Sequence, residues 1–215
     1  MFKKSRSPWG RVDHHSPIGD LGFHHHSTPG HGGIYVPPSM LAKMPAPYRN
    51  SDGWYEEDCE WAKVALSFPS GISERELDQA RKTAINWFPK EFMQVTGISL
   101  NPEDSSTLAK ELFHSVNQNN FIVICAMGSG PCFSSQGRID IPEGMVGCHA
   151  VKGGHNDTGS YAESDTRWAL VSSAEYDTRS IHGFVLQDHH ATWPTTAEVC
   201  RKSQLIASIK ARFAA

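Results

Sequence analysis

The sequence predicts a single α+β domain, residues 1–215, in which a mostly antiparallel sheet packs against three or four helices. Several short apolar runs, rich in branched residues and separated by turn-forming segments, are typical of strands. Other segments have the periodicity of amphipathic helices. The two kinds of segment do not alternate strictly and no internal repeat is visible, so a doubly wound parallel sheet fits poorly. Residues 1–7 are expected to form a flexible tail.

In the first half, two strands are predicted at "FHHHS" (23–27) and "GIYVP" (33–37). The glycines and proline of "TPGHGG" (28–33) join them as a turn. A helix is expected over "WYEEDCEWAKVALSF" (54–68), and Pro69 would end it. The clearest helix is residues 73–88, where Ser73 and Glu76 form a capping-box pattern.

The second half begins with a further helix over 101–120. "NFIVICAMG" (120–128) is apolar on both faces, which is the pattern of a central strand. Three more strands and a last amphipathic helix are predicted, at "MVGCHAV", "RWALVS", "HGFVLQ" and from about Thr196 onward.

Composition excludes several classes of protein. The net charge is −3, whereas a general nucleic-acid binder normally carries a basic face. The five cysteines are an odd number without CxxC spacing, which disfavours both a disulfide framework and a zinc ribbon. No segment approaches the roughly 18 apolar residues of a membrane span, and no signal peptide is visible. We therefore expect a protein that stays in the cytoplasm, away from membranes.

The histidines of residues 20–38 raise the question of a metal site. His24 and His26 would share one face of a strand and could bind zinc, with His31 or the upstream pair His14 and His15 as further ligands. Alternatively, His24 and His26 line a solvated face, or only His25 is buried. We expect no metal and no cofactor, and keep the zinc site as the alternative.

The "TPGHGG" loop could instead cradle an anion, because glycines let backbone N–H groups approach it. It lacks the following Lys-Ser or Lys-Thr of a Walker loop, and a hairpin turn is favoured. His31 is the functional candidate, acting as acid or base with Glu57 or Asp58 as the carboxylate that orients it. Cys59 is a poor nucleophile, because the neighbouring carboxylates raise its pKa.

Two polar clusters in the second half are weaker candidates. His155, Asn156 and Asp157 follow two glycines and indicate a loop tip, and Asp188, His189 and His190 could form a second cluster. Neither matches a catalytic signature.

Several blocks of the chain resemble an uncharacterised domain of phages and conjugative plasmids. That domain often lies at the end of very large polyvalent proteins. They are "TPGHGG", "MP" (44–45), "WYEEDCEWA" (54–62), "FP" (68–69), "NWFP" (86–89), "MVG" (145–147), "AEYD" (174–177) and "GFV" (183–185). The resemblance covers roughly residues 8–190. Gly30 departs from it, since that family usually has serine there, and the triple histidine is not one of its features.

The resemblance implies a mobile-element setting but no established activity. The favoured hypothesis is a binding inhibitor of a host defence component, such as a restriction nuclease or a CRISPR complex, acting in the host cytoplasm. Its expected binding residues are Thr28, Gly32, Gly33, Trp54, Tyr55 and Glu56. The alternative is a small hydrolase or transferase acting on a nucleotide or an amide through His31. Whether the protein is an enzyme, and whether it forms a homodimer, stays open at this point.

Overall fold

The structure is a computed structural model, and it describes residues 4–18, 22–134, 137–156 and 159–193, without the side chains of 132–139 and 192. The chain divides into two compact units, residues 1–110 and 111–215. Each unit combines helices with antiparallel strands, which confirms the α+β class. The expectation that the whole chain is one domain stays a prediction.

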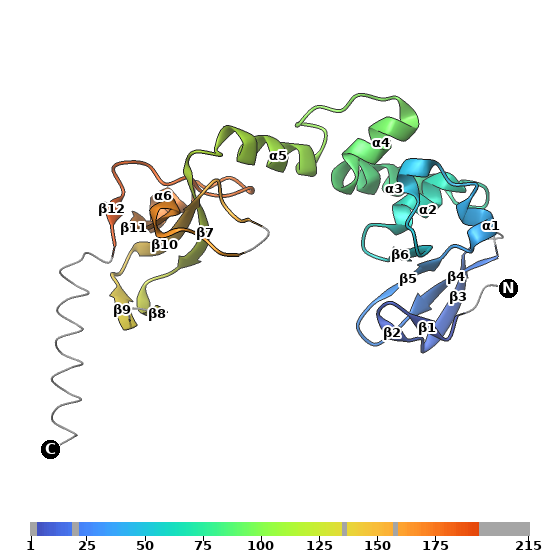
Figure 1. Ribbon diagram of the computed structural model, residues 1–215, viewed down its shortest axis with the longest axis horizontal. Coiled ribbons are helices and arrows are strands. Elements are labelled where there is room, and N and C mark those ends of the chain that lie inside the picture. Colours follow the sequence, from blue (N-terminus) through green and yellow to red (C-terminus); the bar gives the residue numbers. More distant parts are fainter. Residues whose placement is uncertain (1–3, 19–21, 135–136, 157–158, 194–215) are drawn as a thin grey trace, which may run out of the picture. The chain divides into compact units, whose positions relative to one another are not determined.

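The first unit is built on an antiparallel sheet of four strands in the order β3-β4-β5-β6 (Figure 1). The strand bounds are β3 His14–Ile18, β4 Phe23–Ser27, β5 Gly32–Tyr35 and β6 Trp54–Glu56. Ser27 pairs with Gly32, so the predicted hairpin is confirmed and its turn spans residues 28–31. Arg6 and Ser7 were expected in a flexible tail, but they form β1 (Arg6–Ser7), paired with β2 (Gly10–Arg11).

The two faces of this sheet have different surroundings. Phe23, Ile34 and Tyr55 lie on one face, here called the core face, and are buried in the main hydrophobic cluster of the unit. Trp54 lies on the opposite face, where the ring of Trp9 contacts it. This second face is called the tryptophan face.

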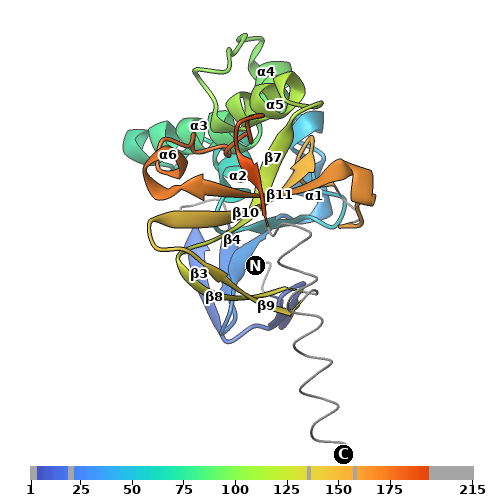
Figure 2. The same cartoon turned by 90° about the vertical axis from the view of Figure 1, so that its left-hand side faces the viewer.

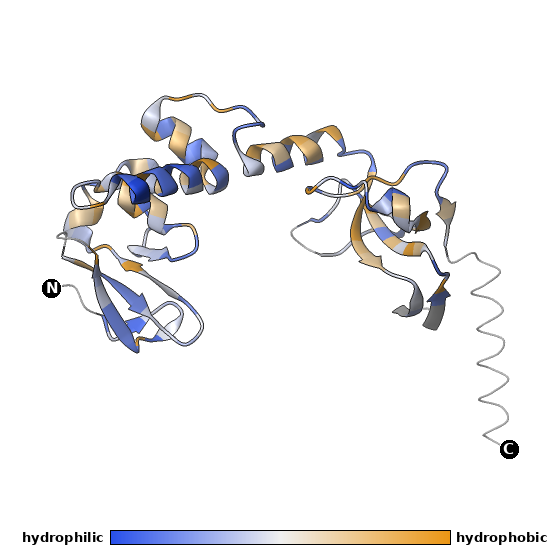
Figure 3. Ribbon diagram, turned by 180° about the vertical axis from the view of Figure 1, so that it is seen from behind, coloured by the Kyte–Doolittle hydropathy of each residue, from blue (hydrophilic) through white to orange (hydrophobic). Residues whose placement is uncertain are grey.

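Helices α1, η1 and α2 contribute side chains to the cluster on the core face, and α3 packs against α2. The helix bounds are α1 Pro38–Leu41, η1 Ala46–Tyr48, α2 Trp61–Ser67, α3 Glu74–Trp87 and α4 Pro89–Thr96. The boundary between the two units falls within α5, Ser106–Val116. The capping box of Ser73 and Glu76 is present at the start of α3, as predicted. Figure 3 shows α3 as largely hydrophilic, in keeping with burial of only a narrow stripe of it.

The helix predicted from residue 54 begins only at Trp61. Trp54 to Glu56 form β6 instead, because the chain pairs with β5 there and buries Tyr55. The acidic residues that followed form the intervening turn, in which Glu56 Oε2 accepts the Asp58 N–H at 2.7 Å. The acids therefore stabilise a turn before the helix rather than its first helical residues.

The second unit has a sheet in the order β12-β11-β10-β7, together with the hairpin of β8 and β9 (Figure 1 and Figure 2). The bounds are β7 Phe121–Met127, β8 Gly130–Ser134, β9 Gly137–Ile141, β10 Met145–Lys152, η2 Glu163–Asp165, β11 Thr166–Ser172, α6 Ser173–Tyr176 and β12 Ala191–Thr192. The core centres on Cys148, Ala150, Ala169 and Val171.

The predicted strands of this unit are present, with one difference. "HGFVLQ" makes only a single bridge, between Val185 and Ile122 of β7, flanked by two backbone hydrogen bonds. The prediction of a central strand for β7 is wrong: β7 is the edge strand of the four-stranded sheet, and only the single bridge from Val185 lies on its other side. Most of its residues are half-buried or exposed rather than covered on both faces. The last predicted helix, from about Thr196, lies outside the described residues. No helix in the described part of the chain is long and apolar enough to cross a membrane.

Candidate functional site

A serine, a histidine and a glutamate form a hydrogen-bonded row at one end of the core face. Ser27 Oγ lies 3.2 Å from His25 Nδ1, and His25 Nε2 lies 3.0 Å from Glu57 Oε2. A carboxylate accepts hydrogen bonds only, so Nε2 carries the proton and Nδ1 is left as the acceptor for the Ser27 hydroxyl. The side chains of His25 and Glu57 are 28% and 40% exposed, so solvent and ligands reach the row.

Strand geometry explains how the side chains of Ser27, His25 and Glu57 come together. His25 and Ser27 are two positions apart on β4 and therefore point to the same face. Glu57 follows β6, and its N–H donates to the carbonyl of Gly32 at 3.1 Å. A Cβ at Gly32 would collide with Glu57 Oε2 and would lie 2.7 Å from the His25 ring. Only glycine leaves room for the pair, and the "TPGHGG" and "WYEEDCEWA" blocks meet at this point.

The structure does not join His31 to the predicted acids Glu57 and Asp58. The His31 side chain is 58% exposed, and its Nδ1 lies 3.9 Å from Glu56 Oε1. Its backbone is fixed by Thr28, whose hydroxyl donates to the His31 carbonyl at 2.8 Å. Thr28 therefore closes the turn, and His25 takes the position beside a carboxylate that was predicted for His31.

The other two histidines of the triplet are buried on the tryptophan face, contrary to the expectation of a solvated face or a buried His25. The N-terminal segment contacts His26, where the Lys4 backbone N–H donates to His26 Nε2 at 3.0 Å. Burial, and then the neighbouring His15, lower the pKa of His26 to about 4. His26 is therefore neutral at physiological pH, with its Nδ1–H buried and unpaired in the described residues.

The remaining predicted binding residues have mainly structural contacts. Tyr55 is fully buried and donates its hydroxyl to the Tyr48 carbonyl at 2.9 Å. Gly33 lies beneath the Trp9 ring, and a Cβ at this position would collide with that ring. Burial, and then Glu56 and Glu60, raise the pKa of Cys59, in the direction expected for a poor nucleophile.

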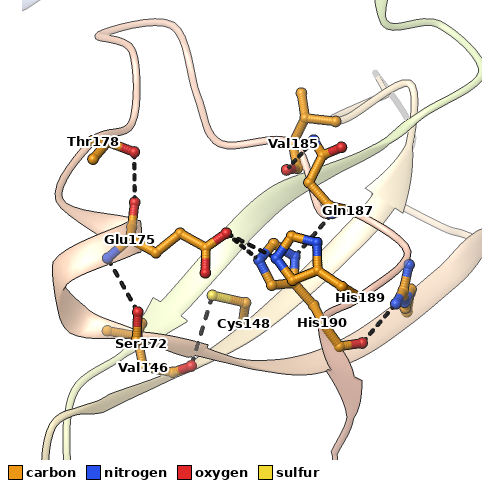
Figure 4. Close-up of polar contacts among 10 residues, drawn as sticks. Val146, Cys148, Ser172, Glu175, Thr178, Val185, Gln187, His189 and His190 are labelled. Carbon is orange, nitrogen blue, oxygen red and sulfur yellow. Dashed lines mark hydrogen bonds and ion pairs between the residues drawn. The ribbon is translucent and has the colours of Figure 1, made fainter.

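A second cluster lies in the other unit and joins α6 to the segment before β12 (Figure 4). Glu175 Oε1 accepts from His190 Nε2 at 2.8 Å and from His189 Nε2 at 3.1 Å. The His190 side chain is 2% exposed, whereas that of His189 is 66% exposed. These hydrogen bonds lower the pKa of Glu175. Sequence reasoning singled out the two histidines with Asp188 and missed Glu175, whose only signal was its position in the "AEYD" block.

The same three side chains are the one group of potential metal ligands that converges in the described residues, which leaves His24, His26 and His31 without a common site. The tautomer of His190 nevertheless disfavours a metal. The Gln187 N–H donates to His190 Nδ1 at 2.8 Å, so Nδ1 is unprotonated and Nε2 must carry the proton. Binding a metal through Nε2 would leave an imidazolate, which is costly. The cluster is better described as a set of structural hydrogen bonds that holds α6 to the segment before β12.

A protein-family comparison matches residues 2–118 to a domain of unknown function (DUF7007). The match ends before the later blocks of the resemblance, which extended to about residue 190. No curated protein and no solved structure matches the chain.

Proposed function

The chain belongs to the DUF7007 family, a family of unknown function, and we propose from the geometry of its N-terminal sheet that it is a small hydrolase or acyl transferase. Ser27 is the nucleophile, His25 is the general base, and Glu57 orients His25. The observation that carries the proposal is the unbroken hydrogen-bonded row of these three side chains. Nucleophile, base and orienting acid within hydrogen-bond reach are the general signature of nucleophilic catalysis.

The chemistry follows from the tautomer. The Ser27 hydroxyl transfers its proton to His25 Nδ1 as Oγ attacks an acyl carbon, and Glu57 stabilises the imidazolium that forms. His25 then returns the proton to the leaving alcohol or amine. Water attacks the acyl-serine in a second step and restores the free hydroxyl. Because the site is partly exposed, we assign it a substrate whose ester or amide group is accessible at the surface.

The setting implied by the resemblance belongs to the same proposal. In a phage or plasmid context the substrate is a host protein, for example a defence nuclease or a component of a CRISPR complex, in the host cytoplasm. The competing hypothesis is a binding inhibitor without chemistry. The resemblance supports the binding hypothesis, but no contact among the described residues does. The enzyme hypothesis is supported by the hydrogen-bonded row of Ser27, His25 and Glu57.

The test is covalent labelling of the purified full chain with a fluorophosphonate, which reacts with activated serines, followed by peptide mapping. We expect labelling of Ser27 that Ser27→Ala abolishes and that Glu57→Gln and His25→Gln reduce at least tenfold. Ser16→Ala is the matched control, because Ser16 pairs with His25 across β3 and β4 and makes no hydrogen bond to it among the described contacts. His31→Ala should also leave labelling unchanged.

Equal labelling in wild type and Glu57→Gln, or no labelling of Ser27 at all, would overturn the enzyme hypothesis. In that case capture of a host partner becomes the leading hypothesis.

A further inference from the structure

The tryptophan face of the first unit carries a surface depression that the proposed catalysis does not use. Its volume is about 530 Å³, and its walls include Pro8, Trp9, Arg49, Asp52, Trp54 and Glu60. His25 and Ser27 lie on the opposite face of the sheet, so the depression is a separate feature.

The aromatic wall of the depression is held in place by packing. The Trp54 ring contacts three other rings, those of Trp9 at 5.7 Å, His26 at 5.1 Å and Tyr35 at 5.1 Å between centroids. Trp9 in turn rests on Gly33, where any side chain would collide with its ring. Two indoles are therefore presented at the surface in a fixed arrangement, at little further cost in side-chain entropy on binding.

The polar wall is acidic. Asp52 Oδ1 accepts a hydrogen bond from the backbone N–H of Trp54 at 3.0 Å, and Glu60 Oε2 accepts one from the backbone N–H of Glu56 at 3.1 Å. These bonds fix both carboxylates, and in the described part of the chain the second oxygen of each makes no hydrogen bond.

The one cation of the wall is already engaged. Arg49 donates from Nε to the Met44 carbonyl at 2.8 Å and from Nη2 to the Ala42 carbonyl at 3.0 Å. Arg49 therefore stabilises the preceding loop through backbone carbonyls and forms no ion pair with Asp52 or Glu60 among the described contacts. Two carboxylates against one guanidinium leave a net negative charge at the depression.

We propose that this depression binds the side chain of an arginine presented by a protein partner or substrate. A guanidinium is planar and stacks on an indole face, and its forked N–H groups match the open carboxylate oxygens. Asp52 and Glu60 supply the charge, and Trp9 and Trp54 supply the stacking surface. An anionic or purely apolar ligand fits less well, because both carboxylates would lose hydration without a partner.

The test is an NMR titration of the full chain with N-acetyl-arginine methylamide, following the indole N–H signals of Trp9 and Trp54. We expect saturable shifts of these two signals and a dissociation constant at least tenfold weaker for the neutral isostere N-acetyl-citrulline methylamide. The double variant Asp52→Asn with Glu60→Gln keeps the shape of the wall and should weaken arginine binding at least tenfold. Glu74→Gln, which removes an exposed carboxylate at the start of α3, is the control and should bind as wild type does.

Equal binding of arginine and citrulline, or an unchanged affinity in the double variant, would overturn the proposal, as would the absence of any shift. Thermal unfolding of each variant checks that the fold is kept. Ser27→Ala should bind arginine normally, so the outcome here is independent of whether the catalytic proposal stands.

Discussion

The buried imidazole of His26 should make the stability of the first unit depend on pH. Its pKa is lowered from the ordinary 6.5 to about 4 in the folded chain, first by burial and then by His15. The unfolded chain therefore takes up a proton below about pH 6.5 that the folded chain refuses. The stabilising contribution is complete above pH 6.5 and is lost as the pH falls toward 4. At about 1.4 kcal/mol per pH unit, the loss amounts to roughly 3 kcal/mol.

Urea unfolding followed by tryptophan fluorescence, at intervals from pH 7.5 to 4, measures this loss. The variant His26→Phe keeps an aromatic ring against Trp54 but cannot titrate, so its free energy of unfolding should fall with decreasing pH by about 3 kcal/mol less than that of wild type. Contributions from groups that do not interact with His26 are shared and cancel in the comparison. The control His31→Gln alters an exposed turn histidine and should follow wild type. Parallel curves for wild type and His26→Phe would refute the reasoning.

Further predictions separate positions that look alike in the sequence. Gly32→Ala displaces the ends of two side chains, so unfolding should change by less than about 1 kcal/mol while fluorophosphonate labelling is lost; Gly33→Ala meets the Tyr55 carbonyl and should cost about 1–3 kcal/mol in urea unfolding. Glu175→Ala leaves the buried N–H of His190 without its acceptor, and should lower the free energy of unfolding by about 1–3 kcal/mol. His189 is the exposed partner of Glu175, so His189→Ala should lower the free energy of unfolding by less than about 1 kcal/mol. Neither zinc nor a chelator should shift the melting temperature, and a zinc-induced rise that Glu175→Ala removes would contradict the assigned tautomer.

Local signals predicted the local structure well. The hairpin of β4 and β5 depends on glycines within a few residues of the turn, and the start of α3 depends on a cap and an acid three residues apart. Both are set by neighbours in the sequence, so they are visible without the fold.

What sequence reasoning missed is set by distant contacts. Trp54 to Glu56 form a strand because β5 lies beside them, which outweighs the helical pattern that follows. The partner of His25 is 32 residues away, and the burial of His26 depends on a segment 22 residues upstream. The sequence hypothesis paired Glu57 with His31 of the "TPGHGG" loop, whereas in the structure Glu57 contacts His25 of β4, and Ser27 was not singled out at all.

The hydrogen bond between residue 4 and His26 also constrains how the N-terminal segment can vary. The donor is a backbone N–H, which nineteen of the twenty amino acids supply equally. Evolution can therefore exchange the side chain at Lys4 at the cost only of its contact with the Tyr35 ring. Proline is the exception, since it has no N–H to donate, and a proline at this position would leave both nitrogens of a buried imidazole unpaired.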